Sequence, residues 1–298
     1  MKEKDVFMRY HPFVNFVFFS LTIGFSLVLT HPAAQGIALF SALFSYLFTS
    51  TGKEIAFLFK LSLPILFLSA LLNPLFNPAG ATVLLYISEG KPITLESLLY
   101  GCSAGVMTVT VLIWFLLFGR VMTSDKFIYL FGRVTPSLSL VLSMALGFVP
   151  RFTHQLKQVV EAQKSMGRDI AAGSLFARFK TLGAILSVMV SWSLENAIDT
   201  ADSMKSRGYG LKGRSAFSLY HMRASDVWLL LWCLLCFVLL IVGVLLSVFD
   251  FRFFPRIGYP SFDLWMLPFY IVYFALCATT LFLNWKETIT WNCLYSGM

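Results

Sequence analysis

The chain has 298 residues, of which 58% are hydrophobic and only 13% are charged, and its formal net charge is +8. A soluble domain usually carries about a quarter charged residues, so this composition excludes an ordinary water-soluble domain. The sequence therefore predicts a membrane protein.

Six stretches carry enough apolar residues to be read as helices that cross the hydrocarbon core of a bilayer, although the second is short. They are residues 12–30, 36–50, 55–76, 99–119, 226–248 and 264–284. The predicted fold class is all-α: a polytopic membrane protein with about six transmembrane helices and a long amphipathic segment between the fourth and the fifth.

Local residue types set further expectations within the first four spans. His31 and Pro32 fit a tight turn between two helices, and Pro64 and Pro74 should kink or end the third span. Residues 81–93 look extended. Thr94, followed by Glu96, predicts the start of a helix with a capping hydroxyl and an acidic first turn.

The lysines and arginines predict the topology. If the N-terminus lies inside, all but three of the 23 basic residues fall on the cytoplasmic side, as the positive-inside rule requires. The exceptions are Lys91, Arg252 and Arg256. We therefore expect a cell-membrane protein with both termini and residues 122–225 in the cytoplasm, and we attribute the positive charge to topology rather than to nucleic-acid binding.

The expected organisation has three parts: residues 1–121 with about four transmembrane helices, residues 122–225 with cytoplasmic helices, and residues 226–298 with about two more spans. Thr123-Ser124-Asp125 can cap a short helix that ends at Gly132. An apolar run at 137–149 follows Pro136, and Pro150 closes it.

Two long amphipathic helices are predicted in the middle segment, at about 152–167 and 182–207. Glycine just past the last turn is a common stop signal, and Gly167 and Gly208 stand at these places. The second helix has an apolar stripe at helical spacing, made of Leu186, Val190, Leu194, Ala197, Ile198, Ala201 and Met204.

Motifs for catalysis and for cofactor or metal binding are absent from the sequence. It has no P-loop motif, its four histidines lack metal-ligand spacing, and no span carries paired carboxylates at its centre. Cys233 and Cys236 form a CxxC pattern inside an apolar run, where packing is the preferred interpretation. We expect a non-catalytic chain with no cofactor and no bound metal.

The order and spacing of five short passages resemble the transmembrane T component of energy-coupling factor (ECF) transporters, the EcfT/CbiQ-like family. The resemblance runs from about residue 55 to 210. The passages are Asn73-Pro74-Leu75-Phe76, Pro92-Ile93-Thr94-Leu95-Glu96, Leu146-Gly147-Phe148-Val149-Pro150-Arg151, Ala162-Gln163-Lys164 and Ser206-Arg207-Gly208-Tyr209.

This resemblance implies that the chain couples ATP hydrolysis to import of a vitamin or transition metal. In that family two Ala-Arg-Gly-like signatures end two cytoplasmic coupling helices and engage two ABC-type ATPases, while a separate substrate-binding S component lies in the membrane. The implied docking residues are Ser206, Arg207 and Gly208 at one end, and Ser165, Met166, Gly167 and Arg168 at the other. The first signature departs from the family pattern because methionine replaces arginine, and Arg168 follows the glycine.

Two other functions remain open from the residues alone. Glu161-Ala162-Gln163 with Gly167 resembles the EAA-x-x-x-G coupling loop of conventional ABC permeases, although it does not explain the second signature. A membrane-embedded enzyme acting on lipids would need a polar cluster, and Glu195, Asp199 and Asp202 come closest. Their spacing puts them on one helix face, where a solvated surface is the preferred interpretation.

Overall fold

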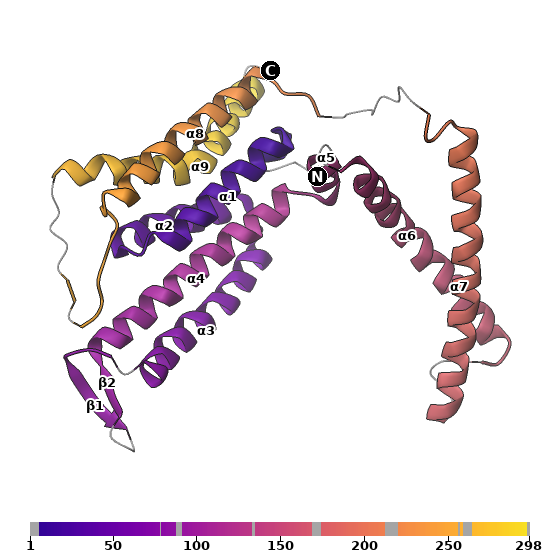
Figure 1. Cartoon of the computed structure of the whole chain (residues 1–298), viewed down its shortest axis with the longest axis horizontal. Coiled ribbons are helices and arrows are strands. Elements are labelled where there is room, and N and C mark those ends of the chain that lie inside the picture. The colour runs from indigo at the N-terminus through magenta and orange to yellow at the C-terminus, as the bar shows by residue number, and fades with distance from the viewer. Residues whose placement is uncertain are drawn as a thin grey trace. The chain divides into compact units, whose positions relative to one another are not determined.

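The computed structural model describes residues 6–77, 79–87, 91–132, 135–168, 174–211, 220–255, 257–258 and 264–296. The chain divides into two compact units (Figure 1). Unit 1 comprises Met1–Lys126 and Tyr220–Met298, and unit 2 comprises Phe127–Leu219. The division falls within a short helix, α5 (Ser124–Gly132), which has the bounds that the sequence predicts.

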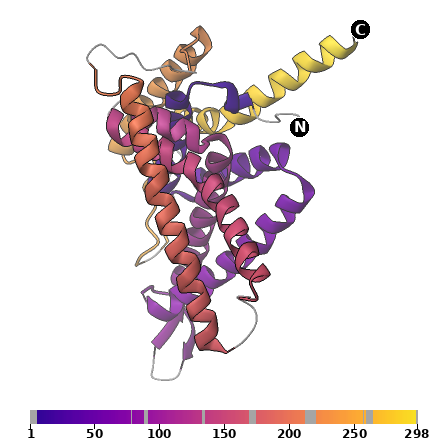
Figure 2. The same cartoon turned by 90° about the vertical axis from the view of Figure 1, so that its right-hand side faces the viewer.

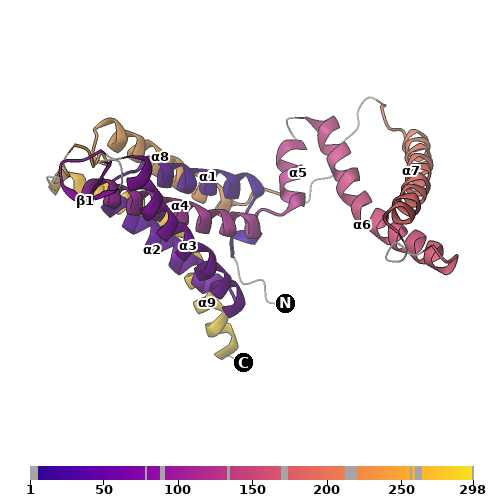
Figure 3. The same ribbon diagram turned by 90° about the horizontal axis from the view of Figure 1, so that it is seen from below.

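Unit 1 is a helical bundle with one small hairpin, and Figures 1 and 3 show its helices gathered side by side. A 3-10 turn at Val6–Arg9 precedes the first helix, and another at Leu264–Met266 precedes the last. The long helices are α1 (Pro12–Val28), α2 (Pro32–Thr49), α3 (Gly52–Phe76), α4 (Leu95–Val121), α8 (Ala224–Leu245) and α9 (Leu267–Ser296).

The bundle is built around α4 and α9. Helix α4 packs against α1, α2 and α3, while α9 packs against α2 and α8, and α8 also contacts α1. The Trp114 ring is fully buried and lies 6.4 Å from the Phe18 ring and 6.3 Å from the Phe19 ring, edge to face in both cases. Edge-to-face aromatic pairs add to the packing energy of such a core.

Six of the described helices are long and apolar enough to cross a membrane, which confirms a polytopic membrane fold with about six spans. Helix α1, which the sequence predicts as a span, is apolar but shorter than these six, with 17 residues. It packs against α4 and α8 within the bundle. Helix α7 (Leu175–Ser206) is also long and apolar enough, although the sequence predicts a cytoplasmic helix there. The other five are α2, α3, α4, α8 and the stretch Leu264–Lys286.

The turn predicted at His31 and Pro32 and the helix start predicted at Thr94 are confirmed. His31 is the N-cap of α2, and its ring accepts a hydrogen bond from the Ala33 N–H. Thr94 is the N-cap of α4, and its hydroxyl accepts from the Ser97 N–H at 3.3 Å. The extended segment is an antiparallel hairpin of β1 (Val83–Ile87) and β2 (Lys91–Thr94), and its connection, residues 88–90, lies outside the described residues.

Proline has less effect on these helices than the sequence suggests. Helix α3 continues through Pro64 and ends at Phe76, two residues after Pro74. In unit 2, α6 (Pro136–Ser165) runs through Pro150 as one helix, so the division expected there is wrong. Proline removes one backbone hydrogen bond from a helix, and the turns on both sides of Pro150 keep the others.

Unit 2 is formed mainly by α6 and α7, which pack against each other (Figures 1 and 2). The rings of Phe148 and Trp192 stack with centroids 5.5 Å apart, and Phe152 lies beside the same indole. Ile185 and Met189 are the buried apolar residues of α7. This contact fixes the two helices against each other within the unit.

Candidate functional site: the ends of helices α6 and α7

Helix α6 ends in a motif built on glycine. Its C-cap is Met166, and Gly167 has a φ of +78°, in the left-handed region that disfavours a side chain. The Gly167 N–H donates to the Lys164 carbonyl at 3.0 Å, and the Arg168 N–H donates to the Gln163 carbonyl at 2.9 Å. This pair of bonds defines a Schellman motif, which satisfies the last carbonyls of a helix.

Helix α7 ends in the same way. Arg207 is its C-cap, and Gly208 has a φ of +79°. The Gly208 N–H donates to the Lys205 carbonyl and the Tyr209 N–H donates to the Met204 carbonyl, each at 3.0 Å. The two predicted glycine stops are thereby confirmed as two Schellman motifs.

The matching backbones give a residue-by-residue correspondence between the two ends. Ser165 corresponds to Ser206, and each hydroxyl donates back to a carbonyl of its own last turn. Met166 corresponds to Arg207 at the C-cap. The next position after the glycine is Arg168 in one motif and Tyr209 in the other. The arginine is therefore displaced by two positions between the ends.

The side chains at both ends are accessible. The Met166 side chain is 62% exposed and that of Tyr209 is 45% exposed, while Arg168 and Arg207 are also exposed. Neither guanidinium forms an ion pair with another residue in the described part of the chain. The partial negative charge of the last carbonyls favours a cation at a helix C-terminus. An exposed guanidinium there can form a bidentate pair with a carboxylate of another protein.

The apolar stripe predicted on α7 is real, and it is not the face that packs on α6. Leu186, Leu194 and Ile198 are each more than 60% exposed. The buried residues Thr181, Ile185 and Met189 form the adjacent stripe. On α6, by contrast, the apolar residues Leu156, Val159 and Val160 are partly buried.

Sequence reasoning missed the residues that hold the two helices together. The Trp192 ring stacks on Phe148 across the α6–α7 contact, and Gln163 on α6 is only 9% exposed. Its Oε1 has no hydrogen-bond partner among the described residues. The aromatic pair Phe148 and Phe152, four residues apart, was the available signal for this face.

Candidate enzyme and metal residues do not gather in the described part of the chain. No group of three or more histidine, cysteine or acidic side chains within those residues could hold a metal ion. Cys233 and Cys236 are buried free thiols on α8, which confirms the packing interpretation. Glu195, Asp199 and Asp202 lie on the exposed surface of α7.

Comparison with known proteins supports the family resemblance. No protein-family model matches the chain. It is 36% identical over 110 residues to the energy-coupling factor transporter transmembrane protein EcfT of Lactobacillus helveticus. The matched residues make up 37% of this chain and 38% of that protein. It is 32% identical over 91 residues to EcfT 1 of Listeria monocytogenes, covering 30% and 34% of the two proteins.

A longer match extends over most of the chain. The EcfT protein of Staphylococcus aureus is 26% identical over 234 residues, which cover 70% of this chain and 85% of that protein. The two matches of higher identity span only about a third of their relatives' length. The chain is thus a membrane protein similar to the EcfT proteins, which confirms the resemblance seen in its short passages.

Proposed function

We propose that this membrane chain, like the EcfT proteins that it resembles, is the energy-coupling transmembrane subunit of an ECF-type ABC importer. In this role it transmits ATP-driven motion from two cytoplasmic ATPases to a separate substrate-binding membrane protein. It carries out no reaction itself. The observation that carries the proposal is the pair of equivalent helix ends, with Arg207 at the C-cap of one, in a chain similar to EcfT.

The first step of the proposal is docking of an ATPase at the end of α7. Arg207 would form a bidentate ion pair with a carboxylate on the ATPase, supported by Ser206 and Gly208. Loss of one partner from such a pair, when water is excluded, costs about 2–5 kcal/mol. The Schellman motif makes this helix end rigid, so a push on Arg207 is passed to the whole of α7.

The second ATPase would dock at the end of α6 through Ser165, Met166, Gly167 and Arg168. Because Met166 stands at the C-cap, the contact at that position is apolar. The guanidinium of Arg168 follows two positions later, where α7 has Tyr209. The two docking contacts would therefore share one backbone conformation, but the arginine would stand at different positions in them.

The substrate-binding S component would cover the exposed apolar stripe of α7. Leu186, Leu194 and Ile198 are too exposed and too apolar to remain against water. Residues 122–225 and both termini would lie on the cytoplasmic side, where the ATPases are, so α7 would lie against the S component although it is long and apolar enough to cross a bilayer. The transported vitamin or transition-metal ion would be bound by the S component.

Affinity purification of the tagged full chain from its native membranes tests the docking proposal. The ATPase subunits are identified in the preparation by mass spectrometry, and their amount per chain is measured. Arg207→Glu places like charges together, so we expect at least a tenfold lower yield of ATPase and a loss of uptake. Lys157→Glu makes the same charge change at an exposed position of α6, and it should leave both quantities unchanged.

The outcomes separate the proposed function from its alternatives. Retention of ATPases and uptake in Arg207→Glu would refute docking at the end of α7. A conventional permease would couple through the Glu161-Ala162-Gln163 segment, so a charge reversal at the exposed Glu161, and not Arg207→Glu, would then lose ATPase. Turnover of a lipid by the purified chain without ATPases would refute the non-catalytic role.

A further inference from the structure

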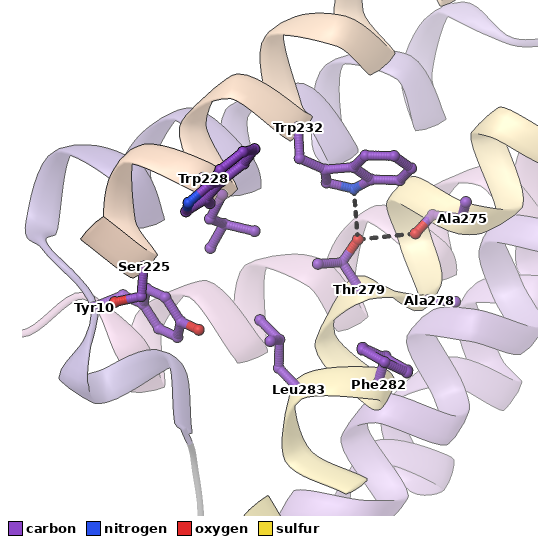
Figure 4. A pocket seen from close by; sticks show the side chains of 10 residues that line it. Tyr10, Ser225, Trp228, Trp232, Ala275, Ala278, Thr279, Phe282 and Leu283 are labelled. Carbon is purple, nitrogen blue, oxygen red and sulfur yellow. Dashed lines mark hydrogen bonds between the residues drawn. The ribbon is translucent and has the colours of Figure 1, made fainter. Parts of the chain in front are cut away.

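Unit 1 contains an open apolar groove between α8, α9 and the segment before α1, with a cavity volume of about 550 Å³ (Figure 4). Trp228 and Trp232 of α8 form one wall, and Thr279 and Phe282 of α9 form the other. Tyr10 and Ser225 lie together at one end, while Trp232 and Ala275 lie at the other. The groove is open to the surroundings of the protein, as the exposure of Trp228 (73%) and Phe282 (60%) shows.

Two of the polar side chains in the groove, those of Trp232 and Thr279, find hydrogen-bond partners within it. The indole N–H of Trp232 donates to the Thr279 hydroxyl at 3.3 Å, and that hydroxyl donates to the Ala275 carbonyl at 2.8 Å (Figure 4). Polar groups that face hydrocarbon must find partners within the protein. This part of the groove therefore presents an apolar surface suited to hydrocarbon.

The length of the groove fits one leaflet of a bilayer. Ser225 and Trp232 are separated by about 10 Å along α8, and Ala275 and Leu283 by about 12 Å along α9, at 1.5 Å per residue. One half of a hydrocarbon core is about 15 Å thick. A chain that enters at the Tyr10 end would thus run along the groove through most of one leaflet.

Basic residues adjoin the groove at the Tyr10 end on each of its three elements. Arg9 precedes Tyr10, Arg223 stands two positions before Ser225, and Lys286 follows Leu283 by nearly one helical turn. All three residues are exposed. Tyr10, Ser225 and Leu283 all line this groove, so each of its three elements carries a basic residue within three positions of the lining.

We propose that this groove is a binding site for an anionic phospholipid. One acyl chain lies between Trp228 and Thr279, and the phosphate faces Arg9, Arg223 and Lys286. Tryptophan and tyrosine favour the interface between hydrocarbon and headgroups, and basic residues at that level attract anionic lipids. The charge at the mouth selects an anionic headgroup, while the apolar walls accept the chain.

The test uses the full chain reconstituted with phosphatidylglycerol and phosphatidylcholine that carry identical acyl chains. Native mass spectrometry from a mild detergent counts the lipids retained by each molecule. The wild type should retain phosphatidylglycerol in preference to phosphatidylcholine. Arg223→Gln should reduce that preference about fivefold, whereas Lys53→Gln, at an exposed position on α3, should leave it unchanged.

Filling the groove tests the site of the acyl chain. Ala278→Phe places a ring against the groove and should reduce retention of both lipids, while Ala56→Phe on an exposed part of α3 should not. Trp228→Ala is a second variant that removes one wall at an exposed position and so spares the fold. Equal retention of the two lipids by the wild type, or unchanged retention in both Ala278→Phe and Trp228→Ala, would overturn the proposal.

Discussion

The backbone N–H of His11 donates a hydrogen bond to Oδ1 of Asp226 at 3.1 Å, across 215 positions of the sequence. The other carboxylate oxygen of Asp226 accepts from the Arg223 N–H at 2.8 Å. Asp226 is only 2% exposed. One carboxylate therefore caps α8 and fixes the start of α1 to it.

The variant Asp226→Asn is expected to destabilise unit 1 by about 1–3 kcal/mol, because an amide can accept only one of the two bonds and leaves the other N–H unsatisfied. Thermal unfolding of the detergent-solubilised protein measures the effect. Asp250→Asn is the control, since Asp250 is exposed. An unchanged unfolding temperature in Asp226→Asn would show that this joint carries no stability.

The end of α6 requires glycine at position 167 because of the backbone conformation there, and not because a side chain would lack room. Nothing lies within 4 Å of a Cβ built there, but its φ of +78° costs any L-residue about 1–2 kcal/mol. Gly167→Ala should therefore loosen the motif and speed hydrogen exchange of the Arg168 amide about fivefold or more.

The matched control is Gly147→Ala in the same helix. Gly147 also has open space around its Cβ position, and it lies within α6. Alanine is favoured over glycine there by about 0.5–1 kcal/mol, so this variant should stabilise the helix. Equal effects of the two substitutions would contradict the assignment of strain to Gly167.

His31 makes the loop between α1 and α2 sensitive to acid. Burial lowers the pKa of His31 from its ordinary value of 6.5. Its Nδ1 accepts from the Ala33 N–H, and its ring lies edge to face with Phe251 and Tyr270. The unfolded state thus binds a proton before the folded state does, so stability is complete above about pH 6.5 and falls as the pH drops below it.

Unfolding temperatures measured between pH 8 and pH 5 test this dependence. His31→Asn keeps a side chain that can cap α2 but does not titrate. The wild type should lose stability relative to His31→Asn as the pH falls through this range. Parallel curves for the two proteins would rule out His31 as the source.

Arg120 joins the ends of three helices in unit 1. Its Nη2 lies 3.1 Å from both Oε2 of Glu54 and the Ser50 hydroxyl, and its guanidinium lies over the Tyr46 ring. The Arg120 side chain is 22% exposed and that of Glu54 is 48% exposed, so solvent screens the pair. A double-mutant cycle of Arg120→Gln and Glu54→Gln should give a coupling energy of about 0.5–1 kcal/mol.

Added salt provides an independent check on this pair. The coupling energy should fall in high salt because the pair is partly exposed. A coupling energy near zero at low salt would contradict the assignment, and it would leave the contact with Tyr46 as the main role of Arg120.

Sequence patterns predicted the features that depend on neighbouring residues. Thr94 at the start of α4 and Gly167 and Gly208 at the helix ends each act on backbone groups within five positions. Local chemistry is enough to place such caps. The predicted break at Pro150 was wrong because a single lost bond does not outweigh the intact turns around it.

Contacts between distant segments could not be predicted from one sequence. The Ser45 and Thr280 hydroxyls are 2.7 Å apart, and the Ser103 hydroxyl donates to Gln35 at the same distance. Each pair joins two helices, and the spacing of apolar residues in the sequence does not show how one helix is rotated relative to the other. The correspondence of Met166 with Arg207, by contrast, follows from the two sequence signatures, and the matching hydrogen bonds agree with it.

The exposed apolar stripe of α7 has a practical consequence for purification. Detergent molecules will cover Leu186, Leu194 and Ile198 in the isolated chain, and they must leave before any protein can occupy the same surface. Assembly through this stripe should therefore weaken as detergent concentration rises, while the buried core around Trp114 is indifferent to it. We therefore expect any complex formed through this surface to dissociate during extraction while unit 1 stays folded.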